Sequence, residues 1–422
     1  MKNNIPTNAL TLTIGYGILT ASTSALAAEG FIEGSTATLQ ARNYYFNRDF
    51  ADIVGPNKKS KAEEWGQGFI LNVKSGYTPG AVGFGVDAIG LLGLKLDSSP
   101  DRTNSGLLPV QEDGRAPDNY SRVGMAIKAK LSNTELKIGE LQPNLPVLTF
   151  SDIRLLPPSY QGVSLVSNEI DGLSLQAGRL NSASQRNESG DEKFQAIVGS
   201  VPKLQASGDH FNYAGADYAF NNKRTSVGAW YAQLEDIYNQ RYFSFQHKEP
   251  LGDWTLGTLI GYYDSKADGK QLIGEVDNQA FHTRLSAKFG GHTFSLGYQA
   301  MFGDQGFTRV FANSSPLSNE SYTYFFDSVD ERSRQARYDY DFAALGVPGL
   351  TTMVRYTKGD NVTTTGNFEG REWERDLDIG YVIQSGPLKN LGMISRNTAV
   401  RSNYRSDINE QRFIVIYTLA LF

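Results

Sequence analysis

Apolar and polar residues alternate with a period of two along several stretches of the chain. In 293–302 one face of an extended strand would be wholly apolar, with Phe294, Leu296, Tyr298, Ala300 and Phe302. In 82–96 the apolar residues share a face that excludes Asp87 and Lys95. Lipid on one side of a strand and water on the other select this pattern. The alternation therefore predicts membrane-crossing β-strands.

Further strands are expected at 69–74, 123–131, 135–139, 173–178, 226–233, 256–263, 280–289, 337–343, 351–357, 375–383 and 393–400. Turn-forming residues separate many of them, at 250–253, 289–292, 346–349 and 385–390. A strand crosses a bilayer in about 9–11 residues, so one strand and its connection take roughly 20. The chain is therefore predicted to be all-β, a transmembrane antiparallel β-barrel of about 18 strands with inward-folded constriction loops.

The first 27 residues have the form of a secretory signal peptide. Lys2 precedes a short apolar centre, and the small residues Ala25 and Ala27 flank the expected cleavage site. Residues 28–422 would then form a single barrel domain in the bacterial outer membrane. A mean hydropathy of −0.37 and the lack of a second long apolar run exclude a helical membrane protein. Cysteine is absent, so no disulfide supports the fold.

Arginines interrupt several of these strands. In the final strand Arg412 alternates with Phe413, and a charge facing the bilayer midplane costs about 2–4 kcal/mol, so Arg412 should face the lumen. Arg396, Arg355, Arg42 and Arg48 interrupt or flank other strands. Any one arginine could instead pair with a carboxylate, stack on a tyrosine or reach the lipid headgroups. Several unpaired arginines inside one barrel would repel unless anions pass, so the set indicates a path for anionic groups.

The segment 139–162 is too long and too apolar for an ordinary surface connection, and it contains four prolines. Folded back into the barrel, it would bury its leucines against the wall and hold Arg154 at a constriction. The sequence leaves two orientations open for Asp152. It could pair with Arg154, or it could face the pore and weaken a preference for anions.

Catalysis is not expected. The four histidines lack metal-ligand spacing, and no Gly-x-Ser-x-Gly elbow is present. We therefore expect no enzyme activity, no metal and no cofactor. The formal net charge of −5, or −6 without the signal peptide, gives no reason to expect nucleic acid as a partner.

The chain closely resembles the OprD-like (Occ) family of substrate-specific outer-membrane channels. The resemblance spans almost the whole mature chain and includes "WGQGFILNVKSGYTPGAVGFGVDAIGLLGLKLD", "SDIRLLPPSYQG", "LEDIYNQRYF", "GVPGLTTMVRY" and "YVIQSGPLKNL". It implies an 18-stranded barrel, monomeric or weakly trimeric, that passes small carboxylate-bearing nutrients. By motif, Arg154 matches the constriction arginine, and Arg48, Arg396 and Arg412 match a basic ladder. Arg355 and Arg42 lie in matching motifs, with their orientation open.

Two departures from the family pattern bear on the substrate. Gly380 stands where ladder members can have lysine, and 313–315 offers an asparagine and two serines where some members have an acidic constriction residue. Asp304 is close enough in sequence to replace that acid. The segment "GRLNSASQRNESGD", with Arg186, looks like the benzoate- and vanillate-type branch.

The resemblance thus implies passive uptake of monocarboxylates, aromatic ones included. The expected partners are small anionic organic solutes, outer-membrane lipid and lipopolysaccharide. Two alternatives are a channel for basic amino acids or small peptides and, from another class, a lipase-type enzyme, which the missing serine elbow disfavours.

Overall fold

The computed structural model describes residues 30–422, apart from 52–58, 200, 312, 315–316 and 367. The expected signal peptide, 1–27, lies outside the described residues. No helix in the described part of the chain is long and apolar enough to cross a membrane.

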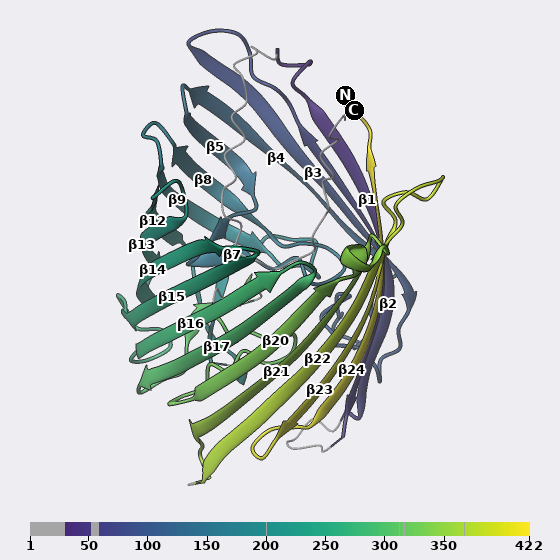
Figure 1. Ribbon diagram of the computed structural model, residues 1–422, viewed down its shortest axis with the longest axis vertical. Helices are drawn as coiled ribbons and strands as arrows, with labels where there is room; N and C mark the ends of the chain where they lie inside the picture. The colour runs from purple at the N-terminus through teal and green to yellow at the C-terminus, as the bar shows by residue number, and fades with distance from the viewer. Residues whose placement is uncertain (1–29, 52–58, 200, 312, 315–316, 367) are drawn as a thin grey trace.

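Eighteen antiparallel strands form one closed sheet, because β1 pairs with both β2 and β24 (Figure 1). The prediction of an all-β barrel with about 18 strands is confirmed. The barrel strands are β1 (Thr36–Phe50), β2 (Lys61–Lys74), β3 (Val82–Asp97), β4 (Asn119–Leu131), β5 (Thr134–Leu141), β8 (Ser159–Ser167), β9 (Leu173–Ser184), β12 (Phe211–Phe220), β13 (Thr225–Leu234), β14 (Tyr238–Leu251), β15 (Trp254–Ala267), β16 (Asp277–Phe289), β17 (His292–Gly303), β20 (Arg332–Asp341), β21 (Leu350–Thr363), β22 (Glu369–Val382), β23 (Gly392–Ser402) and β24 (Ile408–Ala420).

The outer face of the barrel is apolar where the alternation predicted it. On β17, Leu296 is 63% exposed, whereas Gln299 on the other face is fully buried. On β24, Phe413 is 50% exposed and Arg412 is fully buried. Lipid can cover the outward side chains, and the inward ones pack against the loops inside the barrel.

Some boundaries differ from those predicted. The strand expected at 337–343 ends at Asp341, because Phe342–Leu345 form a 3-10 helix, η1, that Asp341 caps. The connection expected at 139–162 is shorter and runs from 142 to 158, since Gly139 and Gly162 pair with each other in β5 and β8. The strands β8, β12 and β14 were not among those predicted.

Four long connections, 98–118, 142–158, 185–210 and 304–331, join strands at one end of the barrel, and short turns join them at the other. Two small sheets link these connections to one another. One consists of β11 (Val201–Gly208), β10 (Phe194–Val198) and β18 (Thr308–Val310), and the other of β19 (Asn313–Ser314), β7 (Leu148–Phe150) and β6 (Asn144–Leu145). In Figure 1, β7 lies inside the ring of barrel strands.

Leucines of two connections fill the space beside the inner wall of the barrel. Leu155 and Leu156, from 142–158, share one buried cluster with Leu107 and Leu108, from 98–118. Inward side chains of the wall, among them Tyr44, complete this cluster. Burial of a leucine contributes about 1.5–3 kcal/mol, so this packing holds both connections against β1 and its neighbours.

Candidate functional site

Five arginines point inward from neighbouring strands, and we call this set the basic wall: Arg42, Arg48, Arg355, Arg396 and Arg412. Their register brings them close together. Arg412 on β24 faces Phe46 on β1 and Arg396 on β23. On the same face of β24, Glu410 faces Arg48 on β1. Asp376 on β22 faces Arg355 on β21. Arg42 and Arg355, whose orientation the sequence left open, are both buried on this inner side.

Each arginine of the basic wall contacts a carboxylate. The pairs are Arg42 with Asp152 at 2.5 Å, Arg48 with Glu410 at 2.6 Å, Arg355 with Asp376 at 2.7 Å, Arg396 with Asp378 at 2.7 Å, and Arg412 with Glu410. The expectation of several unpaired lumen arginines is therefore wrong for these five. Because the register places Arg396 opposite Arg412, carboxylates are needed to offset the like charges.

Arg154 and Arg186 lie in the connections 142–158 and 185–210, and neither forms an ion pair with a described carboxylate. Arg154 donates hydrogen bonds to the backbone oxygens of Ser105 and Ile153, at 3.4 Å and 3.2 Å. Its guanidinium carbon is 5.0 Å from the centre of the Phe46 ring. The two arginines approach the same glycine, since a Cβ at Gly106 would be 3.3 Å from an Arg186 nitrogen and 3.9 Å from Arg154 Nε.

Two arginines pair with Glu410 and two more lie near them, and we call Glu410, Arg48, Arg412, Arg154 and Arg186 the glutamate-centred cluster. Glu410 contacts Arg48 and Arg412 directly. Burial, with the nearby charges of Arg412 and Arg186, lowers the pKa of Arg154 well below its ordinary value. Burial, with the charges of Arg412 and Arg48, lowers the pKa of Arg186 to about 10. The cluster contains four guanidinium groups and one carboxylate, so it has an excess of positive charge.

Solvent reaches the members of this cluster unequally. Arg154 is only 5% exposed and Arg412 is fully buried. The Arg48 side chain is 18% exposed, and Arg186 is partly exposed. In this conformation Arg48 and Arg186 can therefore touch a solute, whereas Arg154 and Arg412 act on it through their electric field.

Asp152 pairs with Arg42 through two hydrogen bonds, from Nη1 to Oδ1 at 2.5 Å and from Nη2 to Oδ2 at 2.9 Å. Arg42 also donates to the backbone oxygen of Arg154 at 2.7 Å, and the Tyr44 hydroxyl donates to that of Ile153 at 3.1 Å. Of the orientations open for Asp152, pairing with Arg154 is thus not observed. Asp152 instead connects the segment 142–158 to β1 through Arg42.

Sequence reasoning missed the residues that neutralise and cover the basic wall. Tyr322, from 304–331, lies with its ring centre 3.4 Å from the guanidinium carbon of Arg396 and 4.6 Å from that of Arg355. Its hydroxyl donates to Asp378 at 2.7 Å. The alternation of β24 places Glu410 on the face of Arg412, and this signal could have found it. No local pattern marks Tyr322, because its position depends on how 304–331 folds back.

The acidic replacement proposed from the sequence does not join this site. Asp304 is exposed, and its amide donates to the backbone oxygen of Asp277 at 3.0 Å, at the beginning of β16. Of the residues 313–315, Ser315 lies outside the described residues. Gly380 lies on the inner side of β22, opposite Ile394.

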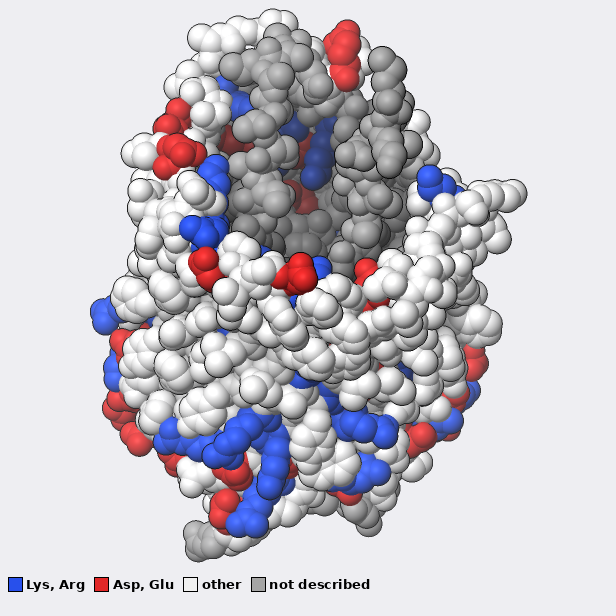
Figure 2. All heavy atoms as spheres, viewed as in Figure 1, with Lys and Arg blue, Asp and Glu red and all other residues white. Residues whose placement is uncertain are grey.

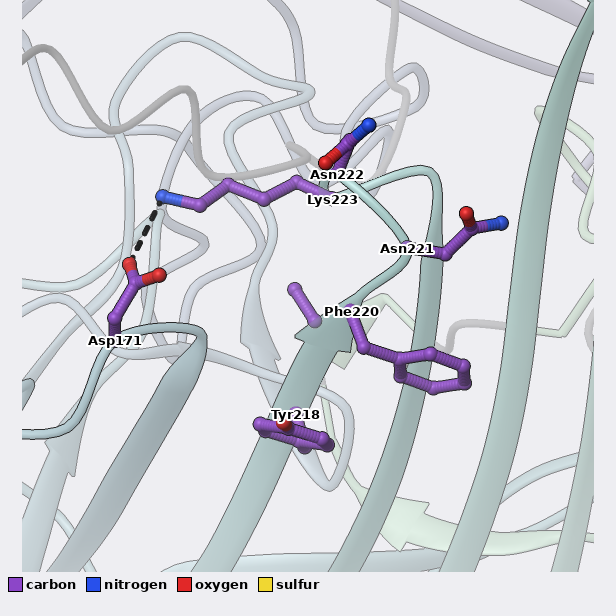
Figure 3. A pocket seen from close by; sticks show the side chains of 7 residues that line it. Asp171, Tyr218, Phe220, Asn221, Asn222 and Lys223 are labelled. Atoms are coloured by element: carbon purple, nitrogen blue, oxygen red, sulfur yellow. Dashed lines mark ion pairs between the residues drawn. The ribbon is translucent and has the colours of Figure 1, made fainter.

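Figure 2 shows both basic and acidic side chains in and around the hollow at the top of the molecule. Another hollow lies at the turn between β12 and β13, where Lys223 forms an ion pair with Asp171 at 3.4 Å (Figure 3). It contains none of the arginines discussed above. Among the described residues, no group of three or more His, Cys, Asp or Glu side chains could hold a metal ion.

Comparisons with known proteins agree with the fold and the length of the chain. A family model described as outer membrane porin, OprD family, matches residues 29–421. Porin-like protein GalP of Pseudomonas putida is 45% identical over 397 residues, which cover 93% of this chain and 94% of GalP. GalP is named as porin-like, and porins are channels.

Solved structures are similar over the same range. OccK9 (OpdG) of Pseudomonas aeruginosa has a TM-score of 0.90 and 51% identity. OpdK of the same species, crystallised with vanillate, has a TM-score of 0.87 and 47% identity. A BenF-like porin from Pseudomonas fluorescens Pf-5 has a TM-score of 0.89 and 44% identity. Each similarity covers 93% of this chain and 100% of the other.

Proposed function

The chain belongs to the OprD family of outer membrane porins and lies in the bacterial outer membrane, and on that premise we propose that it passes small carboxylate-bearing solutes by passive diffusion. The relatives described are channels, so no enzymatic role is proposed. The expected monomeric or weakly trimeric state stays a prediction.

The single observation that carries this proposal is the glutamate-centred cluster. Its four guanidiniums outnumber its one carboxylate, and Arg48 and Arg186 reach solvent. A guanidinium offers paired donors in a plane, which match the two oxygens of a carboxylate. The positive potential draws the solute in, and the competition of Glu410 for the same donors keeps binding weak. Weak binding at several places is what conduction requires.

Aromatic monocarboxylates are the substrate class we favour. Vanillate, present in the OpdK crystal structure, is such a molecule, and OpdK is 47% identical to this chain. A basic amino acid would also need a carboxylate for its cationic end. Two described carboxylates beside the cluster, Glu410 and Asp378, are already engaged by arginines, which argues against that alternative.

Uptake of labelled benzoate and labelled arginine into proteoliposomes tests the proposal. We expect faster entry of benzoate, and a loss of roughly tenfold in Arg186→Gln because electrostatic capture weakens. The matched control is Arg337→Gln, which removes an inward arginine that Asp339 already neutralises at 2.6 Å. Equal entry of the two solutes, or equal losses in the two variants, would refute the proposal.

A further inference from the structure

A group of cations covers the outer surface of β20 to β23 near the end with the long connections. We call Arg332, Arg334, Lys358, Arg371, Arg375 and Arg401 the outer basic patch. They alternate with inward residues and share their strand faces with exposed apolar side chains such as Val354 and Leu377. Figure 2 shows lysines and arginines gathered on the lower part of the visible face.

The register of the strands places like charges in the patch beside one another. Arg334 pairs directly with Lys358, and Lys358 is followed across the sheet by Trp373 and Arg401. Like charges directly opposite each other destabilise a sheet. An anion that binds beside these side chains offsets the repulsion between them.

Carboxylates of the chain neutralise only part of the patch. Asp360 lies 3.2 Å from Arg334, Glu369 lies 3.0 Å from Arg371, and Asp407 lies 3.5 Å from Arg401. Three cations of the patch, Lys358, Arg375 and Arg332, therefore have no described carboxylate within ion-pair distance, although Asp360 lies opposite Arg332 in the register.

The outer surface of β14 to β16 provides a contrast at the same end of the barrel. Arg241 lies 3.4 Å from Asp264, and Lys266 lies 2.6 Å from Asp277. Each cation there has its own carboxylate. The excess of positive charge on β20 to β23 is thus a local property and not a feature of the whole rim.

The position of the patch along the strands matches the boundary of the membrane. Next to it lie Tyr356 and Trp373, with ring centres 5.8 Å apart, and beyond them the exposed aliphatic residues Val354 and Leu377. Aromatic residues mark the interface of a bilayer, and long basic side chains reach from there to the headgroups. Since long connections of such barrels face the outside, the patch lies at the headgroups of the outer leaflet.

We propose that the outer basic patch binds the phosphate groups of lipopolysaccharide, the phosphorylated glycolipid of the outer leaflet. Arginine binds phosphate through paired, charge-assisted hydrogen bonds, and a lipid anchored in the leaflet delivers its phosphates at the height of the patch. Lys358, Arg375 and Arg332 are the side chains that gain a partner. This binding does not depend on which solute the channel passes.

The test is the binding of bisphosphorylated lipid A to the purified barrel in detergent, measured by native mass spectrometry with EDTA present. We expect binding that weakens as salt rises, and a loss of roughly tenfold or more in the variant Arg332→Gln/Lys358→Gln/Arg375→Gln. The control Arg241→Gln/Lys266→Gln should bind as the wild type does. Single-channel conductance, which the outer face should not affect, reports whether each variant is folded.

Two further binding measurements identify the source of the phosphate. Inorganic phosphate should not displace lipid A at equal concentration, because it lacks the anchor and the second phosphate. Dephosphorylated lipid A should bind as weakly as the triple variant does. Equal binding by the triple variant and the wild type, equal losses in the control, or full displacement by inorganic phosphate would overturn the proposal.

Discussion

Asp152 shows how one side chain can fix both the position and the charge of a channel loop. It neutralises Arg42, and Arg42 in turn holds the backbone oxygen of Arg154 at 2.7 Å. Arg154, which the family resemblance places at the constriction, is therefore held in position through its backbone oxygen. Its own guanidinium contacts only backbone oxygens and the Phe46 ring among the described residues.

Replacement of Asp152 by asparagine tests this role. Arg42 would lose its carboxylate and remain buried, and because the Asp152 side chain is 38% exposed, the cost in stability should be about 1–2 kcal/mol. The lumen would gain one uncompensated positive charge. We expect a lower midpoint of thermal unfolding together with a stronger preference for anions. An unchanged midpoint would show that the pair does not hold the loop.

At the scale of elements, the connection 142–158 fits the barrel wall because β2 lacks side chains at two inward positions. A Cβ at Gly68 would lie 2.9 Å from the backbone oxygen of Leu155, and one at Gly66 would lie 2.7 Å from a Leu155 methyl group. The glycines of "WGQGF" thus provide space for the leucine of "DIRLL".

The variant Gly68→Val should move this connection. The added side chain collides with backbone atoms that cannot rotate away, so the loop must shift and the single-channel conductance should change. Gly90→Val on β3 is the control, since a Cβ there first meets Leu71 at 3.6 Å, an ordinary contact. The same conductance in Gly68→Val as in the wild type would contradict the close packing of Leu155.

Only some of the strands could be predicted from the sequence. Alternation predicted the strands with one apolar face, such as β17 and β24, because lipid imposes a period of two on each of them. It missed β8, β12 and β14. On β12 and β14 aromatic residues such as Tyr213 and Tyr242 occupy the inner face as well, so the alternation of apolar and polar residues is weak there. The order of strands in a closed barrel follows from hairpins, so the architecture could be predicted even where single strands could not.

For the whole molecule, the net charge does not describe the charge inside the barrel. The chain has a formal net charge of −5, yet the glutamate-centred cluster is positive. Its members come from β1, β24 and two connections that are far apart in sequence. The sequence predicted inward arginines from the energy cost of facing lipid. It could not predict their carboxylate partners, because those depend on register and on how the long connections fold back.

The zero-current potential across a bilayer with a gradient of potassium benzoate tests the central claim most directly. If the cluster selects carboxylates, the sign of the potential will show that benzoate is more permeant than potassium. The preference should weaken as salt screens the cluster and should fall in Arg186→Gln but not in Arg337→Gln. A potential that reports preference for potassium, or one that Arg186→Gln leaves unchanged, would contradict the account.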